Sequence, residues 1–459
     1  MFNFLKKLWQ NRRGNTLAIA AAALPLVVGA AGLATDTIQW TLWKRQLQRA
    51  ADSAAISGVY DRQLANGDTA NTSNAVSHDL TLNNHVWMGL KTGFPQVAYP
   101  ANSGVMTDQV QVTLAIQQPL PFSSLFMSAA PTIYAVSTAA LIPAGGDACF
   151  EALDTAATTG LNFTGNAGIQ APDCDGFSNA SGSNTSVAQG SSSVTLNSIG
   201  GVGGIQASNN FHVSAYRPYS PVLSDPFSNV NPSASDMHCA GHWTTVGGNG
   251  GNNNSGNGGG TTQVWTNDAL TDSTDMANAV ASDGSHANCW TSMLVNSNTT
   301  LNVPANFGPI YINGGDATIR GNFSCSACTV VMTNSNTATN ATIGTYKVNA
   351  GSNINMTPPL SGTFQGIALY QDRRAVFCTQ CNKVNGNSGS VIQGALYFPS
   401  QELEYNGTGN TTAQCTMFVA KRLNFSGNSV TTNKFKKLAD CSAFAMPGGV
   451  TTYMVRLVA

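Results

Sequence analysis

Two stretches of this 459-residue chain are nearly identical, Leu161-Asn162-Phe163-Thr164-Gly165-Asn166 and Leu423-Asn424-Phe425-Ser426-Gly427-Asn428, and a looser copy is Leu403-Glu404-Tyr405-Asn406-Gly407. In each copy a short hydrophobic alternation leads into a turn of Gly and Asn. Short strands, such turns and imperfect internal repeats are together typical of a solenoid. The repeats therefore predict a parallel β-helix for residues 148–459. A β-sandwich is the alternative, because it too consists of short strands with regular turns.

The composition agrees with stacked coils. Only 9% of the residues are charged, whereas Gly alone numbers 46 and Asn, Ser and Thr are abundant. Equivalent positions of successive coils lie about 4.8 Å apart, so like charges would repel while Asn, Ser and Thr side chains form hydrogen-bonded ladders. The net charge of −1 gives no reason to expect a polyanionic partner such as nucleic acid.

All ten cysteines lie in this second part of the chain: Cys149, Cys174, Cys239, Cys289, Cys325, Cys328, Cys378, Cys381, Cys415 and Cys441. An even number in an outward-facing region predicts disulfides, and a bridge such as Cys149 with Cys174 would join adjacent coils. The two Cys-x-x-Cys units could instead hold zinc. They are 49 residues apart, more than the roughly 15 to 20 of a compact zinc ribbon. We therefore expect no metal and no cofactor, and the pairing stays open.

The first part of the chain has a different character. Residues 63–147 contain no cysteine and predict a small α+β domain, with alternating strands at 109–116 and 133–141. Within the second part, residues 247–260 are only Gly, Asn and Ser. That composition predicts a flexible surface insertion over residues 240–290.

The N-terminus predicts a basic tail, a membrane span and an amphipathic helix. Residues 1–14 carry Lys and Arg but no acid, and residues 15–35 are uncharged. At about 1.5 Å per residue, such a helix can cross the roughly 30 Å of a hydrocarbon core. The basic side is expected to face the cytoplasm. A cleavable signal peptide is the alternative. Residues 36–62 continue as a membrane-proximal amphipathic helix.

The chain resembles TadE/TadG-like proteins of the tight-adherence (Flp-type) pilus system in this region. The resemblance rests on Arg13-Gly14-Asn15, on Gly32-Leu33-Ala34-Thr35-Asp36 and on a helix with the signature residues Leu47, Ala50, Ala51, Asp52, Ala54 and Ala55. Processed prepilins usually have Glu five residues after the Gly at the cut, and here that position is Ile19. The chain is therefore similar to the unprocessed TadG type, which stays tethered to the membrane.

The resemblance implies an accessory component of a tight-adherence pilus or related secretion assembly in the bacterial inner membrane. It implies a single pass, with the C-terminal domain periplasmic or extracellular. The signature helix also includes Asp36. Its stripe of small residues would dock among pseudopilin-like helices or other Tad components. Alternatively, the stripe packs on the chain's own next domain.

The β-helix would then act as a spacer or as an adhesive surface for a surface ligand or polysaccharide. We expect no enzyme, because no nucleophile elbow or phosphate loop is present. The rival hypothesis is a β-helix enzyme or binding module that acts on extracellular polysaccharide. Its most plausible charged cluster is Asp372-Arg373-Arg374, although few further acids accompany it.

Overall fold

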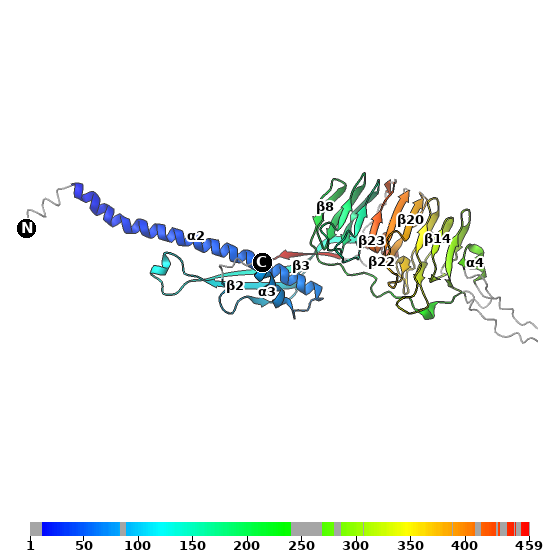
Figure 1. Ribbon diagram of the computed structural model, residues 1–459, viewed down its shortest axis with the longest axis horizontal. Coiled ribbons are helices and arrows are strands. Elements are labelled where there is room, and N and C mark those ends of the chain that lie inside the picture. The colour runs from blue at the N-terminus through cyan, green and yellow to red at the C-terminus, as the bar shows by residue number, and fades with distance from the viewer. Residues whose placement is uncertain are drawn as a thin grey trace, which may run out of the picture. The chain divides into compact units, whose positions relative to one another are not determined.

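The computed structural model describes residues 12–82, 89–239, 269–279, 286–305, 307–387, 389–408, 415–427, 430–431, 438–444, 446 and 451–458. The chain forms two compact units (Figure 1). Unit 1 comprises Met1–Pro143 together with Tyr453–Ala459, and unit 2 comprises Ala144–Thr452. Unit 2 is therefore inserted into the sequence of unit 1. The sequence places the boundary near residue 147 and assigns the last residues to the outer domain. They return to unit 1 because Tyr453 and Val455 pack against its hydrophobic core.

Unit 1 is built on one long helix. Helix α2 (Arg12–Leu64) is continuous over 53 residues and contains Pro25, so the predicted span 15–35 and the amphipathic helix 36–62 are one element. The helix ends where Asn66 and Gly67 adopt φ values of 52° and 88°, and Gly67 donates its N–H to the Arg62 carbonyl at 2.7 Å. Gly suits this position because it takes a positive φ without strain. Helix α3 (Thr72–Leu82) follows.

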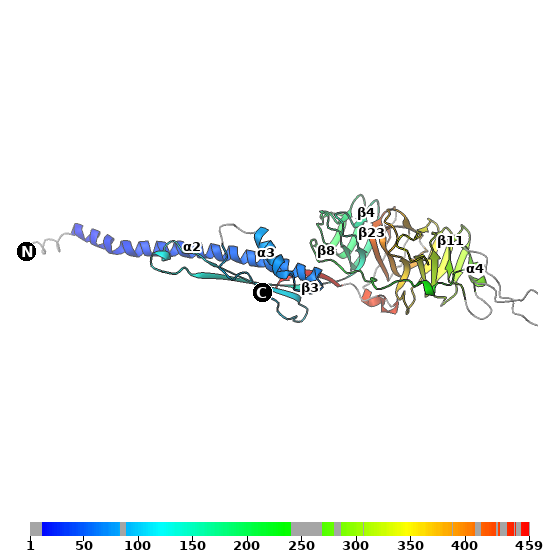
Figure 2. The same cartoon turned by 60° about the horizontal axis from the view of Figure 1, so that its bottom comes forward.

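The sheet of unit 1 is an antiparallel hairpin that lies along α2 (Figure 2). Strands β1 (Gln96–Ala98) and β2 (Thr107–Gln117) pair with each other, and β2 pairs with the first part of β3 (Thr132–Ala152). The loop between them carries the short helix η1 (Ser123–Leu125). The predicted strands 109–116 and 133–141 thus lie within β2 and β3, and their alternating hydrophobic residues face α2 in one core.

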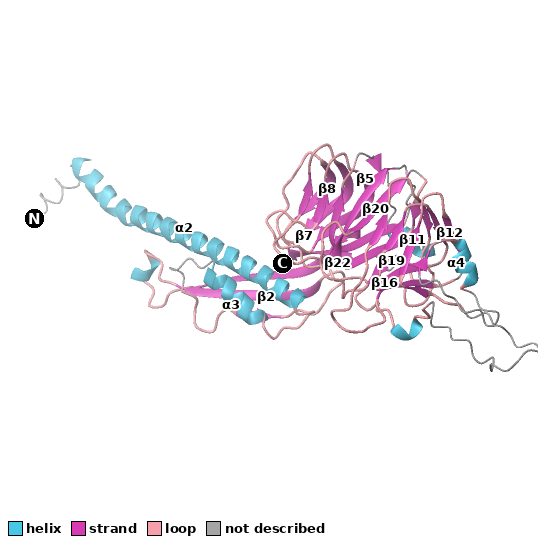
Figure 3. Cartoon of the chain, turned by 45° about the vertical axis from the view of Figure 1, so that its right-hand side comes forward, coloured by secondary structure: helices cyan, strands magenta, loops and turns pink. Residues whose placement is uncertain are grey.

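Unit 2 consists of short parallel strands that form long ladders (Figure 3). The strands of the first ladder are, in spatial order, β10 (Cys289–Trp290), β13 (Pro309–Asn313), β16 (Thr329–Thr333), β19 (Ile367–Gln371), β22 (Gly394–Thr408), β23 (Thr416–Phe425), the end of β3, β5 (Gly168–Ser178), β7 (Ser193–Gly201) and β8 (Phe211–Arg217).

A second ladder repeats this order with β9 (Ala269–Leu270), β11 (Ser292–Val295), β14 (Ala317–Ile319), β17 (Tyr346–Val348), β20 (Asn382–Asn387), the second halves of β22 and β23, β4 (Leu161–Phe163) and β6 (Ser186–Ala188). Further ladders contain β12 (Thr300–Val303), β15 (Asn322–Cys325), β18 (Asn353–Met356) and β21 (Val391–Ile392), and separately β24 (Val430–Thr431) with the first halves of β5, β7 and β8. All these pairings are parallel, unlike the antiparallel sheets of the β-sandwich alternative.

The repeated phrases lie directly on one another in the second ladder. Leu161, Asn162 and Phe163 pair with Leu423, Asn424 and Phe425, which in turn pair with Leu403, Glu404 and Tyr405. The Phe163 and Phe425 rings stack with centroids 5.2 Å apart. Asn162 donates its Nδ2 to Oδ1 of Asn424 at 3.1 Å. The predicted stacking of like residues is therefore confirmed for these two phrases, and the Asn162–Asn424 pair is flanked by Val187 and Glu404 in the neighbouring strands.

The chain joins this stack in its middle. The first strands of unit 2, β3 and β4, pair on one side with the next strands, β5 and β6, and on the other side with β23, near the end of the unit. An ion pair between Arg422 Nε and Asp154 Oδ2, 2.7 Å long, spans this junction across 268 residues of sequence. The strands from β3 to β8 thus extend the stack one way, and those from β9 to β23 return to close it.

The segment 218–239 leads away from β8 toward the other end of the stack, and we call it the return segment. It contains η2 (Ala234–Asp236). The predicted insertion 240–290 is partly regular structure. Residues 269–279 and 286–290 include β9, α4 (Ser273–Asn278) and β10, whose strands join the ladders. The rest of the predicted insertion, residues 240–268 and 280–285, lies outside the described residues.

The chain is therefore an N-terminal apolar helix, a small α+β part and a large β-rich region with parallel sheets.

Candidate functional site

The first part of α2 has no cover within unit 1. Over the described side chains from Ile19 to residue 31 the helix is exposed almost throughout, including Leu24, Leu26, Val27 and Val28. Among the described residues, Ile19–Leu64 is the one helix that is long and apolar enough to cross a membrane. Burying such a surface in lipid removes it from water, which is the main driving force for membrane insertion.

Cover of the helix begins at Gly32 and Asp36. The Phe122 ring lies so close to Gly32 that a Cβ there would overlap it. Asp36 is 4% exposed, and its carboxylate accepts hydrogen bonds from the backbone N–H groups of Phe122 (2.8 Å) and Ser123 (2.6 Å) and from the Ser123 hydroxyl. Burial raises the pKa of Asp36, but these hydrogen bonds outweigh that effect and hold its pKa below the usual value. The signature Asp therefore holds the β2–β3 loop on the helix.

The rest of the signature stripe packs inside unit 1. Four of its residues are buried, Leu47, Ala51, Ala54 and Ala55. They face the hydrophobic residues of β2 and β3, and Ala50 is partly buried against the same core. Asp52 accepts a hydrogen bond from Gln48 Nε2 at 2.9 Å. Of the two alternatives for this stripe, the structure shows packing on the chain's own domain, because the small side chains let the strands approach the helix closely.

The ten cysteines form five disulfides. Cys149–Cys174 joins the neighbouring strands β3 and β5, Cys239–Cys289 joins the end of the return segment to β10, and a third disulfide is Cys415–Cys441. The remaining two are each closed within a Cys-x-x-Cys unit, Cys325–Cys328 and Cys378–Cys381. The structure thus places the adjacent-coil bridge of Cys149 with Cys174 where the sequence suggests it.

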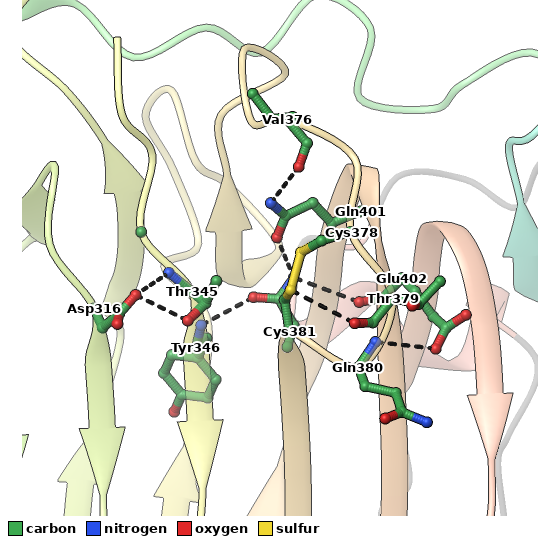
Figure 4. Close-up of a disulfide and its surroundings, with 12 residues drawn as sticks. Asp316, Thr345, Tyr346, Val376, Cys378, Thr379, Gln380, Cys381, Gln401 and Glu402 are labelled. Carbon is green, nitrogen blue, oxygen red and sulfur yellow. Dashed lines mark hydrogen bonds between the residues drawn. A yellow bond between two sulfur atoms is a disulfide. The ribbon is translucent and has the colours of Figure 1, made fainter.

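The Cys378–Cys381 bridge closes a tight loop next to β22 (Figure 4). Gln401 donates its Nε2 to the Val376 carbonyl at 2.7 Å, and the Gln380 N–H donates to Glu402 at 3.3 Å. In each Cys-x-x-Cys unit the two sulfurs are bonded to each other. The four sulfurs therefore do not converge on a shared metal site. No group of three or more His, Cys, Asp and Glu side chains within the described ranges could hold a metal ion.

Arg373 clamps the return segment to the stack. Its guanidinium donates to the carbonyl of Val230 at 2.8 Å and to that of Phe227, and it lies 3.3 Å from Asp225 Oδ2. The Tyr397 hydroxyl donates to the same Asp225 oxygen at 2.6 Å. Arg374 instead pairs with Asp372 at 2.7 Å. The cluster singled out for a possible enzyme is thus occupied with contacts inside unit 2.

Glu151 lies beside this clamp, and sequence reasoning missed it. Its side chain is fully buried, and within the part of the chain that the structure describes neither carboxylate oxygen has a hydrogen-bond partner. Burial, with a further contribution from the Asp225 charge, raises the pKa of Glu151 well above its usual value. Its in-register neighbours are Val419 of β23 and Phe177 of β5. An acid in an otherwise hydrophobic alternation is the signal that could have marked it.

A pocket of about 420 Å³ opens between the return segment and the loop before β19. Aromatic and polar residues line it, among them Asp236, Asn288, Tyr311 and Phe364. The two aromatic rings meet edge to face, with centroids 6.1 Å apart. Burial, with the charge of Asp236, raises the pKa of Tyr311 to about 12, so its hydroxyl stays protonated at neutral pH.

Comparison with known families finds one match at the N-terminus. Residues 14–62 match the Tad family, described as "Putative Flp pilus-assembly TadE/G-like". No curated protein and no solved structure matches the chain. The match covers the exposed part of α2, the carboxylate that holds the loop and the stripe that packs on the hairpin. Residues 14–62 of this chain are therefore similar to the TadE/G-like Tad segment.

Proposed function

We propose that this protein is a membrane-anchored accessory component of a tight-adherence, Flp-type pilus or a related secretion assembly. The observation that carries the proposal is the Tad segment on a helix whose first part is apolar and uncovered. In this proposal α2 crosses the bacterial inner membrane once. The basic residues before the crossing segment keep the N-terminus in the cytoplasm, and unit 2 lies in the periplasm or outside the cell.

We further infer that unit 2 is a parallel β-helix. Its separate ladders contain the same succession of chain segments, as expected when each coil contributes one strand to each face. The chain that forms this β-helix is poor in charged residues and is linked internally by disulfides. It would act as a spacer or as an adhesive surface beyond the membrane, and its role is non-enzymatic.

Partner contact is proposed for the outer face of α2 and not for the signature stripe. The stripe is occupied by β2 and β3, whereas Ile38 and Leu42, which lie one helical turn apart on the same face, are exposed just past the crossing segment. Other Tad components with apolar helices would pack on these residues.

The test is to replace residues 144–452 with a short Gly-Ser linker in the pilus-bearing bacterium. This deletion keeps Tyr453–Ala459, which belong to unit 1, and immunoblotting of membranes checks that the shortened chain accumulates. Loss of attachment with pili still assembled supports the adhesive role, and loss of pili supports an assembly role. Normal pili together with normal attachment would refute both.

A second candidate function is the binding of extracellular polysaccharide at the pocket described above. Aromatic rings beside amide and carboxylate groups suit sugars, whose faces are apolar and whose edges carry hydroxyls. Calorimetric titration with oligosaccharides from the attachment surface tests it. Ser361→Trp, a change at the exposed rim of the pocket, should abolish the heat signal, whereas Val376→Trp, at an exposed position outside the lining residues, should not.

A further inference from the structure

We propose that the loop between β2 and β3 inserts its tip into the same membrane that α2 crosses. The loop spans residues 118–131, and its tip residues are Leu125, Phe126 and Met127. The proposal rests on the proposed membrane anchoring of α2, and it adds a second membrane contact that holds unit 1 against the lipid surface.

The tip residues form an exposed apolar cluster. Leu125, Phe126 and Met127 are 73%, 77% and 51% exposed. Three consecutive large apolar side chains with this exposure are unusual on a surface that faces water. The whole loop, residues 118–131, contains no charged residue, so its insertion would transfer no ionised side chain into the interface.

The hairpin carries this cluster toward the uncovered part of α2. Gln48 donates to the carbonyl of Val136 at 2.9 Å, and farther along the hairpin Lys44 donates to that of Tyr134. The loop itself contacts Asp36 and Gly32. Hairpin residues nearer the tip thus contact α2 residues nearer its N-terminus, and Figures 1 and 3 show the hairpin running along the helix in this direction.

The length of helix that precedes the contact with the loop fits a bilayer. Residues 13–32 extend over about 29 Å at the standard helical rise. That length is close to the roughly 30 Å of a hydrocarbon core. If Arg13 lies at one surface of the membrane, Gly32 and the loop that touches it lie at the other. The apolar tip is then at the depth where lipid headgroups meet acyl chains.

The tip is held in place before it meets lipid. Asp36 accepts hydrogen bonds from the N–H groups of Phe122, just before η1, and of Ser123, its first residue. The Phe122 and Phe126 rings pack edge to face with centroids 5.3 Å apart.

The experiment places a probe at the tip of the full-length chain. All ten native cysteines are in disulfides, so an added cysteine labels selectively without reduction. Phe126→Cys is labelled with an environment-sensitive fluorophore and reconstituted into phosphatidylcholine–phosphatidylglycerol vesicles. Lipids with nitroxide quenchers at shallow or deep acyl positions then report the depth of the probe. The matched control is Val105→Cys, an apolar position that is 67% exposed and precedes β2 at the opposite end of the hairpin. The reference for anchoring is Leu26→Cys, which is 76% exposed on α2.

We expect the probe at position 126 to shift to the blue and to be quenched most by the shallow nitroxide. The probe at position 26 should be quenched most by the deep one, and the probe at position 105 by neither. If position 26 is quenched and position 126 is not, the loop does not enter lipid and the inference is wrong, which would leave a protein partner as the occupant of the tip. If position 26 is also unquenched, the proposed anchoring itself fails.

Discussion

Replacement of Glu151 by Gln should stabilise unit 2, and the gain should depend on pH. The carboxylate is fully buried and accepts no hydrogen bond from the described residues, so ionisation inside the fold is costly. In the unfolded chain Glu titrates near its ordinary pKa of 4.5, whereas in the fold its pKa is raised well above that value. Because folding raises the pKa of Glu151, the stability of the fold is full below the pKa of the unfolded state. Stability is then lost as pH rises from this value toward the pKa of the folded state.

The size of the effect follows from proton linkage. Between the two pKa values, ionisation in the unfolded state alone lowers the free energy of unfolding by about 1.4 kcal/mol for each pH unit. Glu151→Gln has the shape of the protonated acid but cannot ionise. The difference in unfolding free energy between variant and wild type should therefore be near zero at about pH 4 and grow with that slope above it.

The assay is urea unfolding of the full chain in detergent over a series of pH values, followed by circular dichroism. Glu404→Gln is the control with the opposite sign. Burial raises the pKa of Glu404, but hydrogen bonds from Lys383, Asn406 and Ser426 outweigh it and lower the pKa. Its charge therefore contributes stability above the unfolded pKa, and this is lost as pH falls through the folded pKa. The reasoning is refuted if Glu151→Gln is no more stable than wild type at neutral pH, or if its gain does not change with pH.

Three further changes test the stack and its links. Phe425→Ala removes a ring that is buried among four other aromatic rings and should lower the free energy of unfolding by about 3 to 5 kcal/mol; a loss below 1 kcal/mol in the same urea assay would contradict the stacking. Replacing both Cys149 and Cys174 by Ser opens a loop of 25 residues and should cost about 3.5 kcal/mol by loop entropy, measured against wild type under non-reducing conditions. Arg373→Met should release the return segment, so that limited proteolysis cuts within residues 222–231 faster than in wild type; unchanged cleavage there would show that the clamp is dispensable.

The stacking of the repeated phrases could be predicted because the physics is local. Leu161, Asn162 and Phe163 repeat at positions 423 to 425, and the two strands pair in register, so that each residue lies beside its counterpart in the same environment. The same reasoning predicted the strands of unit 1, where every second residue must be apolar. Both signals lie in the order of residues along one strand.

Other features depend on which surfaces meet, and a single sequence does not contain that information. The small residues from Leu47 to Ala55 are equally suited to a partner helix and to the chain's own hairpin, because both require close backbone approach. The cysteine pairs depend on coil order, which the sequence does not state. Tyr453 and Val455 have no periodicity that would distinguish a strand of unit 1 from one of unit 2. Arg373 could be singled out by its charge, but its clamp depends on a return segment far away in sequence.

The position at which the chain joins the stack has a consequence for biosynthesis. The strands β3 and β4 are synthesised first among those of unit 2, yet one of their edges pairs with β23, which emerges about 270 residues later. Until then, that edge presents unpaired N–H and carbonyl groups, and such edges recruit foreign strands. Growth of the stack from β3 toward β8 can proceed during export, but closure has to wait for almost the whole unit. Truncated chains that end before β23 should therefore aggregate more readily than the full-length chain, because their β3–β4 edge stays unpaired.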